Sequence, residues 1–340
     1  MKIIKEEPSY YKDYQCTGNT TCTYICCFAR DLPMDKETLE LYQKEEGEFG
    51  ERLRENIFQD KKSGVWYIKP KEDGCCPFLT EDKLCDVRLH MGEHAQINIC
   101  EIYPRERDIR VGNYRLNRLL IACPEVGRLL YKETDGPLQF VREYEESDEK
   151  IPAELLEKTR LLIAFRDGFV DSIEKGSYDR ILFEEECDTK GLKRIMDEAL
   201  FFEGHEPSDR LFAEVKKILP LSEELKKSFY EKTPEATTWI RRTAAYFAHR
   251  MLLDAVEDGS LDGPIMQVFR SVKMLELMCI ASFHAKGSFD ADDMIECGRL
   301  FGLNFELSMH NFALFKEKLD SVKDVYPDNE NSEIRPYLYP

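Results

Sequence analysis

The sequence predicts a mostly α-helical protein: an irregular, cysteine-rich N-terminal domain with short β elements, followed by an all-α domain. Three observations predict this class. Nine of the twelve cysteines precede residue 124, among segments with the character of loops and short strands. After residue 151, apolar residues recur at helical spacing. Residues 143–150 form an acidic stretch that we interpret as a linker, so the predicted domains are residues 1–142 and 151–325.

The N-terminal domain is expected to contain only short regular elements. Tyr10 to Arg30 has the composition of a loop that wraps an ion. A helix should follow, with Asp35 as its N-cap and Glu37 in its first turn. Further elements are expected as a strand over 65–69, helical turns within 74–104, a hairpin over 109–120 with a Gly-Asn turn, and a helix from 124 to 131.

The second domain is expected to consist of helices joined by short turns. One helix should begin at Thr233-Pro234, because a hydroxyl N-cap followed by proline is a common helix start, and Gly259 should end it. The predicted helices span residues 152–174, 189–203, 208–218, 222–231, 233–258, 264–285, 290–302 and 307–321.

Charge and hydropathy exclude two classes of partner. A net charge of -18 opposes binding to nucleic acid, which depends on lysine and arginine. No run approaches the roughly 18 apolar residues of a membrane helix, since Arg270, Lys273 and Glu276 interrupt the best candidate, residues 268–283. The first seven residues turn acidic before any apolar stretch develops, unlike a secretory signal. We therefore expect a cytoplasmic protein without nucleic-acid or membrane partners.

The cysteines predict a metal centre. In a reducing compartment, clustered thiols are more often metal ligands than disulfides, and short loop spacings let the backbone curl around an ion. Adjacent Cys26 and Cys27 should point apart, so one is a spectator or the two serve different metal atoms. The three later cysteines should be small buried hydrophobes. The eight candidate ligands are Cys16, Cys22, Cys26 and Cys27 in a first group, and Cys76, Cys85, Cys100 and Cys123 in a second.

The ligand type leaves two metals open. Tetrahedral sulfur sites suit zinc or an iron–sulfur cluster. Zinc motifs usually pair their cysteines in short knuckles, and only Cys22 with Cys26 or Cys27 has such a spacing here. Single cysteines drawn together by the fold are typical of iron–sulfur proteins. We favour an iron–sulfur cluster and keep zinc as the alternative.

Over residues 14–135 the succession of motifs resembles the flagellin lysine-N-methylase family, and also a wider cysteine-cluster group described as zinc- or iron-chelating. The resemblance rests on the order of the first cysteine group, Met34-Asp35-Lys36-Glu37-Thr38, Cys76-Pro77-Phe78-Leu79-Thr80-Glu81-Asp82-Lys83-Leu84-Cys85, Gly92-Glu93, Cys100-x2-Tyr103-Pro104-Arg105 and Cys123-Pro124-Glu125-Val126. Cys75 is an additional thiol, and Phe28 to Pro33 stands where the family usually has a tryptophan-containing stretch.

The resemblance implies a protein-lysine N-methyltransferase that acts on flagellin or another lysine-bearing protein, with S-adenosylmethionine as methyl donor. It also implies an iron–sulfur cluster, a [4Fe–4S] cluster in our interpretation, whose candidate ligands are the eight cysteines; eight thiols allow one cluster with spare thiols or two sites. Tyr103, Glu93 and Arg105 flank these cysteines and are the candidates for a catalytic role. The sequence has no glycine-rich loop between a strand and a helix, so the donor-binding residues are not predicted. It also lacks the CxxxCxxC motif of radical enzymes, because Ala29 stands at the third cysteine position.

Two other functions remain compatible with the residues. The protein can be a non-enzymatic zinc- or iron-binding protein whose helical half serves as an interaction surface. It can also be an electron-transfer protein, since cysteine-ligated clusters exchange electrons. Binding of S-adenosylmethionine separates the enzyme from the first of these alternatives, and reversible bleaching by a mild reductant would favour the second.

Overall fold

The computed structural model describes residues 1–16, 25–27, 32–72, 74–82, 84–133, 136–184, 189–199, 206–258 and 260–315. Contacts divide the chain into two compact units. The cysteine unit consists of Gln15–Glu106 and Cys123–Glu125, and the helical unit consists of Met1–Tyr14, Arg107–Ala122 and Val126–Pro340. The cysteine unit therefore interrupts the helical unit twice along the sequence.

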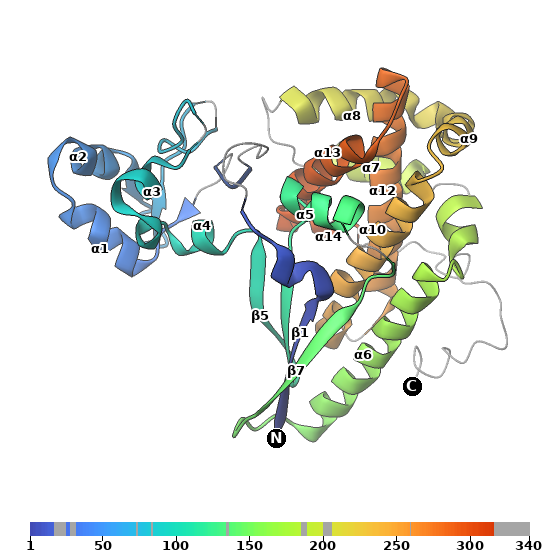
Figure 1. Ribbon diagram of the computed structural model, residues 1–340, viewed down its shortest axis with the longest axis horizontal. Coiled ribbons are helices and arrows are strands. Elements are labelled where there is room, and N and C mark those ends of the chain that lie inside the picture. Colours follow the sequence, from blue (N-terminus) through green and yellow to red (C-terminus); the bar gives the residue numbers. More distant parts are fainter. Residues whose placement is uncertain are drawn as a thin grey trace. The chain divides into compact units, whose positions relative to one another are not determined.

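A four-stranded sheet with the order β5–β6–β1–β7 lies almost entirely in the helical unit. Its strands are β1 (Lys2–Pro8), β5 (Arg105–Val111), β6 (Tyr114–Leu119) and β7 (Phe140–Glu146). The turn between β5 and β6 contains Gly112 at a φ of 54°, which confirms the predicted hairpin. β1 runs parallel to β6 and antiparallel to β7, so the N-terminal strand lies between two strands from much later in the chain (Figure 1).

The acidic stretch interpreted as a linker is in part a strand. Residues 143–146 belong to β7, where Glu143 lies opposite Lys5 of β1 and Glu146 lies opposite Lys2. The lysines of β1 offset part of the negative charge that gave this segment the composition of a linker. The boundary predicted between residues 142 and 151 does not separate the two units, because β1, β6 and β7 join the helices that follow.

The chain is mostly α-helical, as predicted. Most helices begin and end within a few residues of their predicted bounds, although the predicted ends beyond residues 199 and 315 lie outside the described residues. From residue 124 onward, the helices are α5 (Pro124–Arg128), α6 (Ala153–Glu174), α7 (Thr189–Glu198), α8 (Glu206–Ile218), α9 (Ser222–Lys232), α10 (Ala236–Met251), α11 (Ala255–Asp258), α12 (Asp262–Lys286), α13 (Ala291–Phe301) and α14 (Met309–Ala313).

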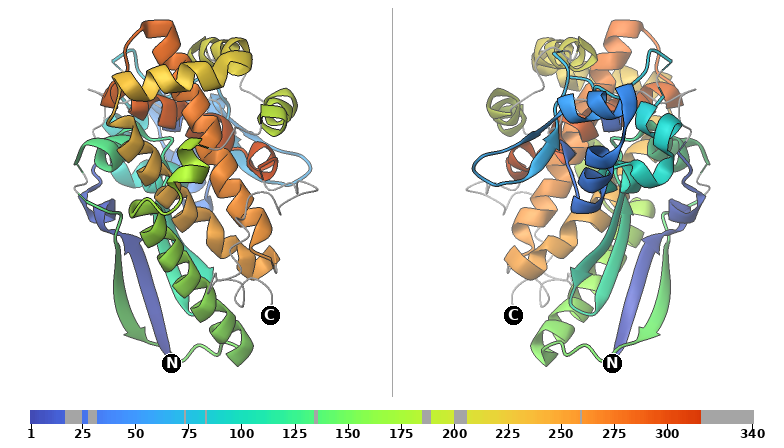
Figure 2. Two further views of the ribbon diagram at one scale, coloured as in Figure 1. Left: turned by 90° about the vertical axis from the view of Figure 1, so that its right-hand side faces the viewer. Right: turned by 90° about the vertical axis from the view of Figure 1, so that its left-hand side faces the viewer.

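Helix α12 is the centre of the helical unit. Every residue from Pro264 to Phe283 is buried, and α8, α9, α10 and α13 pack around it (Figure 2). A helix that is buried on all sides needs partners for its charged residues. Lys273 and Glu276 form an ion pair at 3.2 Å, and Arg270 donates a hydrogen bond to the carbonyl of Phe315 at 3.3 Å. The charges that argued against a membrane helix are therefore paired inside the protein.

The predicted helix over residues 233–258 is divided. Thr233 does not cap it; its amide donates to the carbonyl of Phe229 at 2.9 Å and so closes α9. α10 begins at Ala236 after an N-cap of Glu235 that makes no side-chain capping bond. A short 3-10 segment, Leu252–Asp254, then separates α10 from α11. Thr233 is instead the C-cap residue of α9, and its carbonyl accepts from the Ala236 amide at 3.1 Å in the turn that leads into α10.

A buried ion network fastens β1 and β7 to α6 and α10. Glu6 is fully buried, and Arg166 of α6 donates two hydrogen bonds to its carboxylate at 2.6 and 2.8 Å. Arg142 of β7 donates a third at 2.7 Å. His249 of α10 lies 3.4 Å from the same carboxylate and stacks on Phe140, with 4.3 Å between ring centroids. Burial lowers the pKa of His249 to about 4, so the imidazole is neutral at pH 7.

The cysteine unit combines short helices with a three-stranded sheet. Its elements are α1 (Lys36–Lys44), α2 (Gly47–Glu55), α3 (Asp86–Met91), α4 (Asn98–Ile102), β2 (Leu32–Pro33), β3 (Ile57–Gln59) and β4 (Trp66–Ile68), with the strand order β2–β4–β3. The strand predicted over 65–69 is thereby confirmed. Asp35 caps α1 as predicted, accepting from the Thr38 amide at 2.9 Å. Its second oxygen accepts from the Asn98 amide of α4 at 2.9 Å, so one carboxylate fixes two helix starts.

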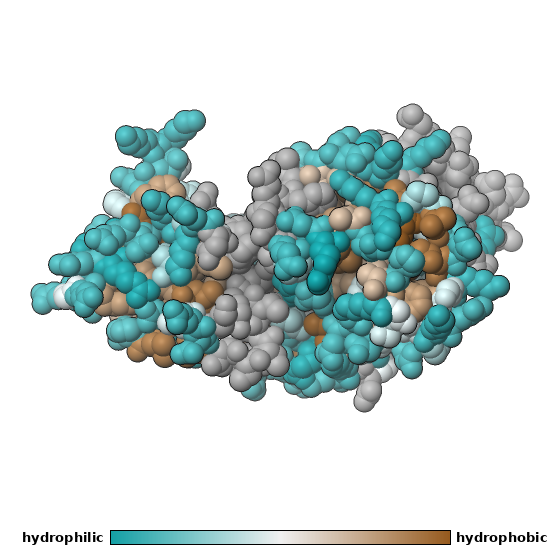
Figure 3. Space-filling model, turned by 90° about the horizontal axis from the view of Figure 1, so that it is seen from above, coloured by the Kyte–Doolittle hydropathy of each residue, from teal (hydrophilic) through white to brown (hydrophobic). Residues whose placement is uncertain are grey.

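Hydrophilic residues cover most of the face drawn in Figure 3. Large apolar side chains that remain exposed are scattered over separate elements, with Leu89 on α3, Tyr144 on β7 and Leu221 just before α9 among the most exposed. No helix in the described part of the chain is both long enough and apolar enough to cross a membrane.

Candidate metal centre

Cys76 and Cys85 stand at the two ends of a tight loop. An isolated bridge joins Leu79 to Cys85, and the Asp86 amide donates to the carbonyl of Phe78 at 2.8 Å. Phe78 is buried in the core of the cysteine unit and anchors the loop from inside. Cys85 then serves as the N-cap residue of α3. The loop therefore holds two of the predicted ligands at the edge of one apolar core.

Cys100 joins these two cysteines from α4. All three thiols pack against the same apolar cluster, whose largest members are Tyr42 and Phe78. Helices α1 to α4, drawn in Figure 1, each contribute side chains to this cluster or to its edge. Three of the four predicted ligands of the second group thus share one core, because the unit brings a loop and a separate helix together.

The first cysteine group reaches the second through Cys26 and Cys27. These two form a short 3-10 turn with Ile25, and the amide of Cys76 donates to the carbonyl of Cys27 at 2.7 Å. The expectation that the adjacent thiols point apart is wrong: their sulfur atoms lie 3.8 Å from each other. A 3-10 turn is tighter than an extended strand and leaves neighbouring side chains on nearby faces. Both sulfurs can therefore serve one centre.

The pKa values of the thiols also indicate that the two cysteine groups lie near each other. A hydrogen bond with Cys26, followed by burial and by Cys76 and Cys100, raises the pKa of the Cys27 thiol. Burial raises the pKa of Cys76 to about 11, and burial together with Cys26, Cys76 and Cys85 raises that of Cys100. The thiols are held in a place that disfavours several negative charges. Thiolates there need a cation among them, which a bound metal supplies.

Donor chemistry and geometry set different limits on this centre. The side chains that converge are all thiols, the soft donors that zinc and iron–sulfur clusters take. Yet within the described stretches no three Cys, His, Asp or Glu side chains form a group that could hold a metal ion. Cys22, one of the predicted ligands, lies outside those stretches. The residues fit a sulfur-ligated group by chemistry: Cys26 and Cys27 lie side by side, a backbone hydrogen bond joins Cys27 to Cys76, and Cys76, Cys85 and Cys100 pack against one core.

The other predicted site residues differ in their exposure. Cys16 is exposed, whereas Cys123 is buried directly before α5 and falls within the cysteine unit. Tyr103 and Arg105 are partly buried after α4. Glu93 is exposed, and its carboxylate forms an ion pair with Arg88. Of the later cysteines, Cys279 and Cys297 are buried core residues as predicted, and Cys187 lies outside the described residues.

Arg52 is a structural residue of the loop that sequence patterns did not indicate. From α2 it forms an ion pair with Asp86 and donates to the carbonyl of Pro77 at 2.9 Å, so it holds both ends of the cysteine loop. Its guanidinium also lies 5.8 Å from the ring centre of Phe78. Nothing in the sequence marks this arginine, because its role depends on a loop that follows α2 by many residues.

An Arg52→Met variant is expected to loosen the cysteine loop by about 1 kcal/mol, since Asp86 loses its cationic partner while Arg52 itself is partly exposed. Amide exchange at Asp86 and Thr80 should become roughly fivefold faster, as measured by hydrogen exchange with NMR detection. Arg54→Met is the matched control on the same helix, because Arg54 bonds the carbonyl of Glu45 instead. Equal exchange rates in both variants would contradict this role.

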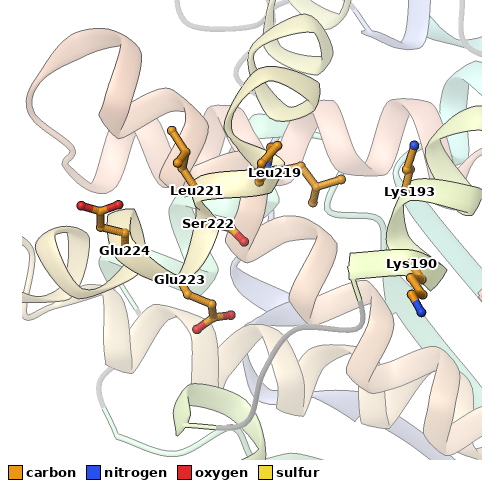
Figure 4. A pocket seen from close by; sticks show the side chains of 8 residues that line it. Lys190, Lys193, Leu219, Leu221, Ser222, Glu223 and Glu224 are labelled. Atoms are coloured by element: carbon orange, nitrogen blue, oxygen red, sulfur yellow. The ribbon is translucent and has the colours of Figure 1, made fainter.

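A surface cavity of about 480 Å³ lies in the helical unit. Lys190 and Lys193 of α7 line it on one side, and residues 219–224 at the start of α9 line it on the other (Figure 4). The lining therefore includes two acidic residues, Glu223 and Glu224, as well as the two lysines. None of the lining residues is a cysteine or histidine, so this cavity is separate in kind from the thiol cluster.

Comparisons with known proteins find relatives for part of this chain. Over 139 residues the chain is 30% identical to the flagellar biosynthetic protein FliU of Salmonella muenchen, and the match covers 40% of this chain and 81% of that protein. It is also 30% identical to the lysine-N-methylases of Salmonella choleraesuis strain SC-B67 and Salmonella typhimurium strain LT2, covering 34% of each. The chain thus matches about a third of the length of the two methylases. No family model and no solved structure matches it.

Proposed function

The chain belongs to the family of the flagellar biosynthetic protein FliU, and on that premise we propose that it is an S-adenosylmethionine-dependent lysine N-methyltransferase of flagellin with a cysteine-held iron–sulfur cluster. The lysine-N-methylases among its relatives support the type of reaction. The observation that carries the metal part is the 2.7 Å hydrogen bond from the Cys76 amide to the Cys27 carbonyl, which joins the two cysteine groups.

A [4Fe–4S] cluster takes four thiolates, and the candidates among the described residues are Cys26, Cys27, Cys76, Cys85 and Cys100. When bound, an iron–sulfur cluster supplies positive charge for the surrounding thiolates and a Lewis-acidic iron. The apolar core beneath the thiols keeps water away from one side of the group, and Arg52 fixes the loop that carries Cys76 and Cys85. Cys16, Cys22 and Cys123 complete the set of proposed ligands.

Methyl transfer requires a deprotonated amine in line with the methyl group. The lysine ε-nitrogen forms a bond to the methyl carbon while the bond from that carbon to the sulfonium sulfur breaks. S-adenosylhomocysteine leaves with the electron pair, and the proton of the amine passes to a base or to water. Tyr103 is a better candidate than Glu93 for a residue near this step, because Glu93 is exposed and already pairs with Arg88.

The test is methyl transfer by oxygen-protected protein. Recombinant unmethylated flagellin is incubated with the protein and S-adenosylmethionine that carries a labelled methyl group. We expect label in flagellin and, by mass spectrometry, lysines heavier by one or more methyl groups. Flagellin with acetylated lysines is the control and should remain unlabelled. Absence of label in native flagellin, with metal present in the protein, would overturn the proposal.

The alternative of a non-enzymatic metal-binding protein rests on the thiol cluster alone, which needs no methyl donor. Titration calorimetry with S-adenosylmethionine separates the two functions. Heat of binding supports the enzyme. A protein that retains its metal, binds no donor and transfers no methyl group would be the metal-binding protein instead.

A further inference from the structure

β7 forms one edge of the four-stranded sheet. The strand order β5–β6–β1–β7 places it last, and it pairs on one side with β1 (Figure 2). At the end of that pair Met1 and Ser147 exchange two hydrogen bonds, at 2.7 and 2.8 Å. In an antiparallel ladder, residues that are hydrogen-bonded to the neighbouring strand alternate with residues whose amides and carbonyls point away from that strand. The register therefore fixes which groups of β7 remain on the open side.

Counting from Ser147, the amides and carbonyls of Val141, Glu143 and Glu145 point toward β1. Those of Arg142, Tyr144 and Glu146 point outward, and in the described part of the chain no backbone hydrogen bond to them is formed from another element. An exposed edge of this kind is a template on which a further strand can pair.

The side chains along the edge are acidic. Glu143, Glu145 and Glu146 are all exposed, while the one arginine of the strand, Arg142, is engaged with Glu6 and Asp167. Lys5 of β1 pairs with Glu145 and lies opposite Glu143, so a single lysine serves two carboxylates. The outer side of the edge therefore keeps an excess of negative charge.

We propose that β7 binds an extended, lysine-bearing segment of the protein substrate, which adds to the sheet as a fifth strand. This inference rests on the proposed function for the identity of the partner. Glu143 and Glu145 lie on one face of the strand, about 7 Å apart, so lysines at alternate positions of the incoming segment would lie opposite them. The outward amides of Arg142, Tyr144 and Glu146 supply the ladder, and the carboxylates select a basic segment over a neutral one.

Charge also disfavours a second copy of this chain as the occupant. Two β7 strands side by side would bring the same carboxylates together, and like charges opposite each other destabilise a strand pair. The remaining candidate within the molecule is residues 316–340 of this chain. Binding by a separate peptide distinguishes them, because a segment of the same chain seated on β7 would block the peptide.

The first test measures binding of a fluorescent ten-residue peptide of alternating lysine and threonine to the full chain by anisotropy. Wild type should bind it, and Tyr144→Pro should bind roughly tenfold more weakly, because proline removes an outward donor but no bond to β1. Tyr144→Thr keeps the amide and is the matched control, expected to bind as wild type does. Equal affinities of the proline and threonine variants, or no binding to wild type, would overturn the proposal.

The second test addresses charge. A Glu143→Gln/Glu145→Gln double variant should weaken binding of the lysine peptide about threefold to tenfold at low salt, with a smaller difference at high salt. The matched peptide of alternating glutamate and threonine should not bind. Glu157→Gln, which removes an exposed carboxylate on α6, is the control and should leave binding unchanged. A double variant that binds the lysine peptide as tightly as the wild type does would contradict the charge argument.

A third measurement does not depend on folding of the proline variant. In the wild type, amide exchange at Arg142, Tyr144 and Glu146 should slow at least about tenfold on peptide binding, while the amides of Glu143 and Glu145 are protected beforehand. Unchanged exchange at Tyr144 with bound peptide would place the peptide elsewhere. If exchange is unchanged while the protein still methylates flagellin, the proposal that β7 binds the substrate is wrong and the proposed function is unaffected.

Discussion

A Cys100→Ser variant is expected to lose its bound iron and sulfide to background, together with the absorbance from sulfur-to-iron charge transfer. Cys100 comes from α4, and Cys26, Cys76 and Cys85 raise the pKa of its thiol, so the variant removes the ligand that α4 contributes to the group. A serine hydroxyl is a hard, rarely ionised donor and a poor ligand for soft metals. Iron, zinc and sulfide analysis of oxygen-protected protein provides the measurement.

The control for this variant is Cys75→Ser, which changes the thiol next to Cys76 but outside the proposed set. It should retain the metal of the wild type. A Cys100→Ser protein with full metal content would remove Cys100 from the set, and a wild type without any metal would refute the centre itself. Zinc without sulfide or colour would replace the iron–sulfur cluster by the zinc alternative.

A Glu6→Gln variant is expected to lower the free energy of unfolding by about 3 kcal/mol, because fully buried Arg166 would lose the charge of Glu6 and keep only the partly exposed Asp167 as its anionic partner. The two hydrogen bonds to Arg166 and the one to Arg142 converge on this single group, so its charge holds β1, β7 and α6 together. Urea unfolding at pH 7, followed by circular dichroism, measures the change.

Asp171→Asn is the matched control, because it breaks an ion pair of the same α6 helix that is exposed on both sides, Lys175 with Asp171. Exposed pairs of this kind contribute at most about 1 kcal/mol, and an i,i+4 pair about 0.5 kcal/mol. The control should therefore unfold near the wild-type midpoint. Similar losses in the two variants would mean that the buried network stabilises the fold no more than a surface pair does.

Local signals in the sequence were sufficient for most helices. The apolar spacing of residues 152–174 and the charged but buried residues 264–283 both became long helices, α6 and α12. Asp35 caps α1 because capping depends on a residue and its immediate neighbours. The start of α10 was misplaced because Thr233 is the C-cap residue of α9 and α10 begins three residues later, at Ala236, which the residues around Thr233 do not indicate.

The cysteines show which features of the site can be predicted from residue type and spacing. They indicated which side chains to consider and which metals suit them, because ligand chemistry resides in the residue itself. They did not indicate that Cys26 and Cys27 lie with their sulfurs 3.8 Å apart, or that Arg52 holds the loop between Cys76 and Cys85. Those features depend on a 3-10 turn and on packing between distant segments.

By itself, then, the sequence determined that the protein is mostly helical, that its thiols gather in one N-terminal region, and that its charge opposes nucleic acid. Only the tertiary structure decided that the first strand joins the helices and that the acidic stretch after residue 142 is an edge strand. The reason is physical: helix periodicity and ligand type are local properties, whereas strand pairing is chosen by distant partners, here β1 with its lysines opposite the glutamates of β7.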